Sequence, residues 1–162
     1  MKRSIAARSF AFSLALLLPL MALAAPVEIG QPLPELKLLD QREAPWEVQS
    51  TTRLLLFAPG RKAGEIAQAV LAEQPSEWMA TRQVMYVADL SRMPSMVTRM
   101  FALPALRAEP FSVGVVLDEK LLGDWPRRTD TVTLLRLHEG SVTAVDYAGS
   151  AEELRAAIGR ER

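Results

Sequence analysis

A short apolar run at residues 53–58, Arg-Leu-Leu-Leu-Phe-Ala, constrains the fold more than any other segment. It stops abruptly at Pro59 and Gly60. A run of this length bounded by turn residues is typical of a strand buried on both faces of a sheet. From Gly64 to Pro75 the pattern becomes helical, with the apolar residues Ile66, Ala69, Val70 and Ala72 at helical spacing. The order is therefore strand, turn, helix.

The same order recurs further along the chain. Residues 83–90 have a strand-like pattern, and Pro94 then begins a segment that we expect to be helical and to end at Pro104. One helical face of this segment carries Met96, Val97, Met100 and Phe101. Residues 111–117 are the next strand candidate, and a short turn or helix at 120–125 follows it.

The C-terminal part predicts a hairpin and a last helix. Strand candidates at 131–137 and 141–147 are separated by the tight turn His-Glu-Gly at 138–140. After them, Ser150 and Glu153 have the spacing of a capping box, which marks the start of a helix. Strands that alternate with helices and close with a hairpin indicate an α/β domain with a mixed sheet.

The N-terminus has the three-part layout of a secretory signal peptide. Three bases within the first eight residues precede an apolar run at 10–23, and Ala-Leu-Ala follows. We expect cleavage after Ala24, with Ala25 as the first mature residue, because cleavage one residue later would place Pro26 directly after the broken bond. The alternative is an uncleaved N-terminal anchor, although the run is shorter than the roughly 20 residues of a membrane span.

The mature chain, residues 25–162, fits a single domain. Its proline-rich start, residues 25–50, predicts an extended lead-in with little regular structure. Loss of the signal leaves 16 basic against 19 acidic residues, a net charge of −3. An acidic, exported domain argues against a nucleic-acid partner, and after cleavage we expect no stable membrane span.

The sequence contains no cysteine, which excludes thiol and disulfide chemistry and a lipoprotein anchor. Its one histidine, His138, falls in the predicted hairpin turn without neighbouring metal ligands. Nucleotide, flavin and hydrolase motifs are absent from the sequence. We therefore predict no cofactor and no metal.

Four segments resemble thioredoxin-fold proteins of the peroxiredoxin and TlpA-like layout. They are the opening at 30–34, the first core strand at 54–59, the inserted strand at 111–118 and the closing hairpin at 133–140. More narrowly, residues 57–61 are similar to the cysteine-free YtfJ-like proteins of the Gram-negative periplasm. The resemblance implies a thioredoxin-like three-layer sandwich, with a mixed central sheet flanked by helices.

The sequence departs from that resemblance at both halves of the redox site. Redox members place two cysteines at the start of the first helix, where Lys62 and Glu65 stand here. They also place a cis-proline before the hairpin, at the position of Val132. We expect a trans peptide bond at Val132, because a non-proline cis bond costs roughly 2.5 to 4 kcal/mol.

The remaining candidate is a basic rim, because bases at a helix start attract anions. Its predicted binding residues are Pro59, Gly60, Arg61, Lys62, Arg127, Arg128 and Val132. The alternative is a solvated face with no ligand.

We hypothesise a periplasmic binding or interaction module whose partner is a protein or a small anionic ligand. Two alternatives are a cofactor-dependent oxidoreductase or electron-transfer protein without thiol chemistry, and a redox-dead regulator of a thioredoxin-like partner.

Overall fold

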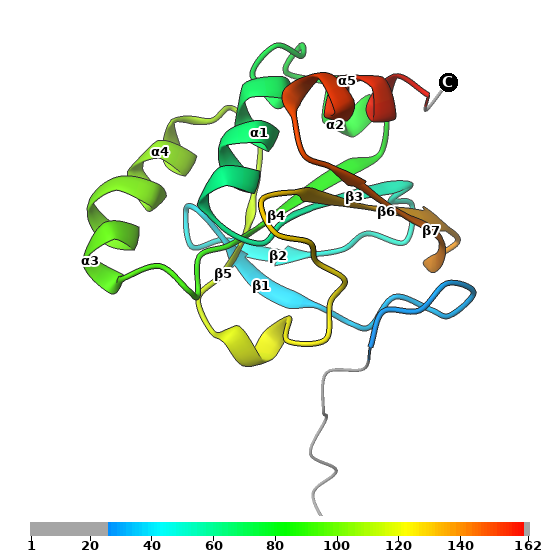
Figure 1. The fold of residues 1–162 in the computed structure, drawn as a ribbon, viewed down its shortest axis with the longest axis horizontal. Helices are drawn as coiled ribbons and strands as arrows, with labels where there is room; N and C mark the ends of the chain where they lie inside the picture. The colour runs from blue at the N-terminus through cyan, green and yellow to red at the C-terminus, as the bar shows by residue number, and fades with distance from the viewer. Residues whose placement is uncertain (1–25, 161–162) are drawn as a thin grey trace, which may run out of the picture.

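The computed structural model describes residues 26–160, and within them one seven-stranded mixed sheet has the order β2-β1-β5-β4-β3-β6-β7 (Figure 1). The predicted signal peptide, with Ala24 and Ala25, lies outside the described residues. The strands are β1 (Lys37–Asp40), β2 (Pro45–Glu47), β3 (Leu54–Ala58), β4 (Val84–Asp89), β5 (Gly114–Val116), β6 (Val132–His138) and β7 (Ser141–Ala148). The helical elements are α1 (Arg61–Leu71), α2 (Trp78–Thr81), α3 (Ser95–Val97), the π-helical turn η1 (Thr98–Ala102), α4 (Leu103–Ala108), the 3-10 turn η2 (Glu119–Leu121) and α5 (Ala151–Gly159).

The three central strands run parallel, and antiparallel strands flank them on both sides. β3 pairs with β4, and β4 with β5, in parallel, whereas β3 pairs with β6 and β1 with β5 in antiparallel fashion. All five residues of β3 are buried. Leu54 and Leu56 enter one hydrophobic core, and Leu55 and Phe57 enter the other. The prediction of a strand buried on both faces is confirmed.

The two cores lie on opposite faces of the sheet and have different covers. Buried residues of α1, α4 and α5 pack against one face, where Val70, Leu106 and Leu154 belong to one cluster. The other face is covered by the segment around η2, through Leu122 and Trp125, and by the lead-in. The molecule therefore has three layers, of which the helical one carries α1 and its neighbours (Figure 1).

The lead-in is more regular than the sequence predicts. β1 and β2 form an antiparallel hairpin at the edge of the sheet, with Leu38 opposite Trp46. Pro45 is tolerated there because an edge strand leaves one side of its backbone unpaired. The expectation of little regular structure at 25–50 was wrong for this hairpin.

The helix expected to end at Pro104 continues to Ala108. Its α-helical start passes into the π turn η1 and then into α4. Pro104 directly follows the π turn, where the regular hydrogen-bond ladder of the helix is already interrupted, so its missing N–H is tolerated. The face that the spacing marked as apolar is largely exposed, with Met96, Met100 and Phe101 each above 60%.

The C-terminal predictions are confirmed. β6 and β7 form the hairpin, and its turn residues Glu139 and Gly140 have φ values of 49° and 77°. The Ser150 hydroxyl accepts a hydrogen bond from the amide of Glu153 at 3.2 Å. The Glu153 carboxylate does reach back, but it accepts from the amide of Gly149 at 2.7 Å, one residue before the capping Ser150, whose own amide a standard capping box would use.

Candidate functional site

The turn from β3 into α1 presents a helix start to solvent. β3 ends at Ala58, and Gly60, with φ 141°, reverses the chain into α1 in a conformation that favours glycine. No side chain of the described residues caps this helix by a hydrogen bond. Its first amide groups therefore stay available to an acceptor from outside.

Two exposed bases follow in the first turn of α1, and each has an acidic neighbour. The Arg61 guanidinium lies 2.6 Å from the Glu65 carboxylate, one helical turn further on. The Lys62 ammonium lies 3.3 Å from the carboxylate of Asp130, in the loop before β6. The second contact brings the start of α1 next to the loop that carries the other predicted rim residues.

Arg127, unlike these two bases, is largely buried, with 19% of its side chain exposed. Its guanidinium lies 3.4 Å from the carboxylate of Asp89 at the end of β4, donates to the carbonyl of Leu122, and stacks 5.4 Å from the centre of the Phe57 ring. Asp89 in turn accepts from the amide and hydroxyl of Ser91. Arg127 therefore ties strands together beneath the rim and is not a free surface base.

Of the last two predicted rim residues, one is exposed and the other is buried. Arg128 is exposed and lies 3.9 Å over the ring of Tyr147. Val132 is fully buried, pairs with Ala148 in the hairpin and, like every peptide bond in the described part of the chain, is trans. Of the four predicted bases, the exposed ones are thus Arg61, Lys62 and Arg128, which we call the basic rim.

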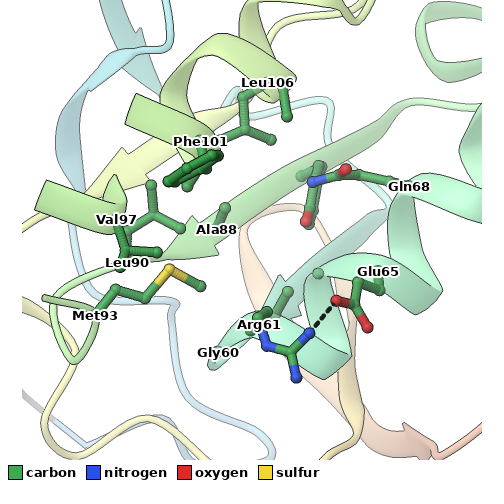
Figure 2. A pocket seen from close by; sticks show the side chains of 15 residues that line it. Gly60, Arg61, Glu65, Gln68, Ala88, Leu90, Met93, Val97, Phe101 and Leu106 are labelled. Carbon is green, nitrogen blue, oxygen red and sulfur yellow. Dashed lines mark hydrogen bonds and ion pairs between the residues drawn. The ribbon is translucent and has the colours of Figure 1, made fainter. Parts of the chain in front are cut away.

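A cavity of about 200 Å³, which the sequence did not indicate, opens beside the start of α1 (Figure 2). It lies between α1 on one side and the α3–η1–α4 segment on the other, with β4 as its floor. Its walls are mainly apolar, from Ala58, Ala88, Leu90, Met93, Val97, Phe101, Ala102, Ala105 and Leu106. Polar groups enter from α1 through Arg61, Glu65 and Gln68.

Tyr86 supplies a buried polar group to this cavity. Its side chain is fully buried, and its hydroxyl has no hydrogen-bond partner among residues 26–160. Burial raises the pKa of the phenol far above its usual range. The Gln68 carboxamide lies close to the hydroxyl and acts to lower that pKa, although its geometry falls short of a hydrogen bond. Tyr86 is thus a protonated donor at every physiological pH.

The exposed face of the α3–η1–α4 segment was the signal that could have located the cavity. Apolar residues at helical spacing are usually core, and sequence periodicity does not distinguish a buried face from one beside an open cavity. A π turn, which is frequent at functional sites, becomes visible only once the backbone is known. Tyr86 was interpreted only as part of a strand.

No known protein family matches the sequence, and no curated protein matches it. Solved structures do match. The thioredoxin domain of a thiol-disulfide oxidoreductase from Bacteroides vulgatus has a TM-score of 0.56 at 11% identity, over 83% of this chain and 97% of that one. A thio-disulfide isomerase from Thermus thermophilus has a TM-score of 0.51 at 21% identity, over 83% of this chain and 97% of that one. A peroxidoxin from Mycobacterium tuberculosis has a TM-score of 0.54 at 12% identity, over 84% of this chain and 97% of that one. The chain has a thioredoxin-like fold.

The thioredoxin-like fold is shared here without the thiols that the names of these neighbours imply. Lys62 and Glu65, at the start of α1, occupy the positions where the resemblance places the redox cysteines. The described part of the chain also holds no cluster of histidine, cysteine and carboxylate residues that could bind a metal ion. Within residues 26–160, no helix is long and apolar enough to cross a membrane.

Proposed function

We propose that this chain is an exported, redox-inactive binding module of the periplasm, related to the YtfJ-like proteins, that docks an acidic partner on the basic rim. The observation that supports the proposal is the uncapped start of α1 with exposed Arg61 and Lys62 in its first turn, and Arg128 in the loop that Lys62 contacts through Asp130. Positive ends of helix dipoles and nearby bases both favour negative charge.

The geometry limits how strong this docking is. Arg61 and Lys62 each already have an acidic neighbour, at 2.6 and 3.3 Å. A partner carboxylate must compete with those pairs, so binding is moderate and weakens with salt. Such a surface suits a reversible protein contact, with a small anion as the alternative occupant.

The test is partner capture from periplasmic extract with the variant Lys62→Glu and Arg128→Glu. A contact at a helix start contributes on the order of 1 kcal/mol, so losing two lowers capture about tenfold or more. The matched control is Arg53→Glu with Arg160→Glu, the same charge change at exposed positions outside the rim. Surface substitutions change stability by about 0.5 kcal/mol or less, and both variants should melt close to the parent.

Equal capture by the rim variant and the parent at low salt would mean that the rim is only a solvated face and does not bind the partner.

Export is checked on the same material, because the intact mass of the periplasmic protein should correspond to a chain that begins at Ala25. Recovery of the full chain from the membrane fraction would instead support the uncleaved anchor.

A further inference from the structure

We propose that the cavity between α1 and the α3–η1–α4 segment binds a small neutral molecule, about one ring in size, through an oxygen that accepts a hydrogen bond from the Tyr86 hydroxyl. The cavity lies beside the basic rim but shares only Arg61 with its exposed bases. The inference therefore stands on observations separate from the proposed docking function.

The size of the cavity sets the size of the ligand. An apolar protein cavity of about 150 Å³ accepts benzene, and this one has about 200 Å³. Sites for drug-sized molecules and cofactors begin at about 300 Å³. A single substituted ring fits the space, whereas a nucleotide or a flavin does not.

The walls favour an apolar body. Leu90, Met93, Val97, Phe101 and Leu106 line one side of the space, opposite α1, in Figure 2. Met93 is unbranched and adapts its shape to an irregular ligand. Phe101 is 66% exposed although it lines the cavity, so it offers a ring face that a ligand can cover.

Tyr86 requires an acceptor in this space. Buried polar groups in folded proteins are nearly always hydrogen-bonded, and one left unpaired lowers stability. Tyr86 lines the cavity, and its hydroxyl is fully buried behind the surface of the walls. Gly64, on the facing side of α1, leaves room next to it, since a Cβ there would stand 3.8 Å from the hydroxyl oxygen. A ligand carbonyl reaches this donor when the Gln68 side chain, which lies beside the hydroxyl, moves aside.

Charge at the mouth selects a neutral ligand. Arg61 and Glu65 neutralise each other at 2.6 Å, so no net positive charge faces the entrance. The carboxyl group of Glu109 lies near enough to Tyr86 to raise the pKa of the phenol, and it would repel an anion. The walls offer no other charge to compensate one on the ligand, and a buried unpaired charge is costly.

Three ring probes of similar size test the inference on the mature protein by NMR titration. Acetophenone carries a neutral carbonyl, ethylbenzene lacks the oxygen, and benzoate is charged. We expect acetophenone to bind about tenfold more tightly than ethylbenzene, a ratio set by one buried hydrogen bond, and to shift the amide signals of Gly64 and Ala88. Benzoate should bind more weakly than either. Equal affinities for all three, or shifts confined to other surfaces, would contradict the proposal.

Tyr86→Phe separates binding from folding. Because the hydroxyl has no hydrogen-bond partner within residues 26–160, the variant should melt at or above the parent temperature while its preference for acetophenone over ethylbenzene disappears. Ala102→Leu fills the mouth and should abolish binding of both probes, whereas Ala156→Leu, an exposed position on α5, should leave it unchanged.

A Tyr86→Phe variant that keeps the tenfold preference would overturn the proposal, as would one that melts clearly below the parent, since the hydroxyl would then have a structural role. The rim variant Lys62→Glu with Arg128→Glu should bind acetophenone like the parent. Failure of partner capture and failure of probe binding are therefore distinguishable.

Discussion

Arg127 shows how one side chain can hold two layers of the molecule together. It joins Asp89 at the end of β4 to the segment that precedes β6, and it covers the ring of Phe57. Asp89 is 3% exposed in its side chain, so its carboxylate contacts this guanidinium and Ser91 rather than water. Removing one member of a buried ion pair costs about 3 to 5 kcal/mol because the other charge is left uncompensated.

We expect Arg127→Glu to lower the free energy of unfolding by at least about 3 kcal/mol, because it places a second carboxylate beside Asp89. Urea denaturation measures the change. Arg128→Glu, one residue further and exposed, is the matched control and should shift stability by about 0.5 kcal/mol or less. Similar losses in the two variants would mean that Arg127 is as solvated as its neighbour.

The sequence did not show that Arg127 is buried whereas Arg128 is exposed. The thioredoxin-like layout correctly brought the loop at 126–131 next to the start of α1, as the contact between Lys62 and Asp130 shows. Adjacent residues of the same type gave no means of telling which guanidinium turns inward. That choice depends on Asp89 and Phe57, which come from other strands and become neighbours only in the folded chain.

At the scale of single elements, the β1–β2 hairpin depends on the carboxylate of Asp40. It accepts hydrogen bonds from the amides of Arg42 and Ala44 at 2.7 and 2.9 Å, and from the Ser112 hydroxyl at 3.3 Å. Burial alone would raise the pKa of Asp40, but these hydrogen bonds and the charge of Arg42 outweigh it and hold the pKa below its ordinary value. The folded chain therefore favours the ionised form.

The stability from Asp40 is fully present above the ordinary aspartate pKa of about 3.9 and is lost as the pH falls through the lower pKa of the folded state. We expect Asp40→Asn to destabilise the protein at pH 7, by less than about 1 kcal/mol because the site is partly exposed, and to reduce the further loss below about pH 4. Urea titrations at pH 7, 4 and 3 measure this. Asp124→Asn, an exposed aspartate, is the control, and identical pH slopes for all three proteins would contradict the role of Asp40.

Elements with a strong local signal were predicted well, and those set by packing were not. The buried run of β3 and the cap of α5 follow from short stretches of sequence. The hairpin β1–β2 pairs with β5, more than 70 residues later in the chain, so no local pattern reveals it. The π turn at Thr98–Ala102 was not predicted either.

For the whole molecule, the absence of cysteine is the strongest functional constraint. Disulfide exchange and thiol peroxidation need a thiolate nucleophile. The purified protein should therefore match buffer in insulin reduction and in peroxide consumption, at any pH between 6 and 9. Activity above buffer would mean that another group performs the chemistry, and it would favour the cofactor-dependent alternative. The native absorption spectrum would identify a coloured cofactor directly.

The π turn over the cavity has a consequence for how this chain can gain or lose residues. A regular α-helix turns through about 100° per residue, so a single deletion swings everything after it around the axis. A π turn already carries one residue more than an α turn, and deletion of one codon from Thr98–Ala102 would yield a continuous helix with Leu106 still facing the core. We expect this stretch to tolerate a deletion that ordinary helices do not, and the cavity to change its shape while the sheet beneath keeps its own.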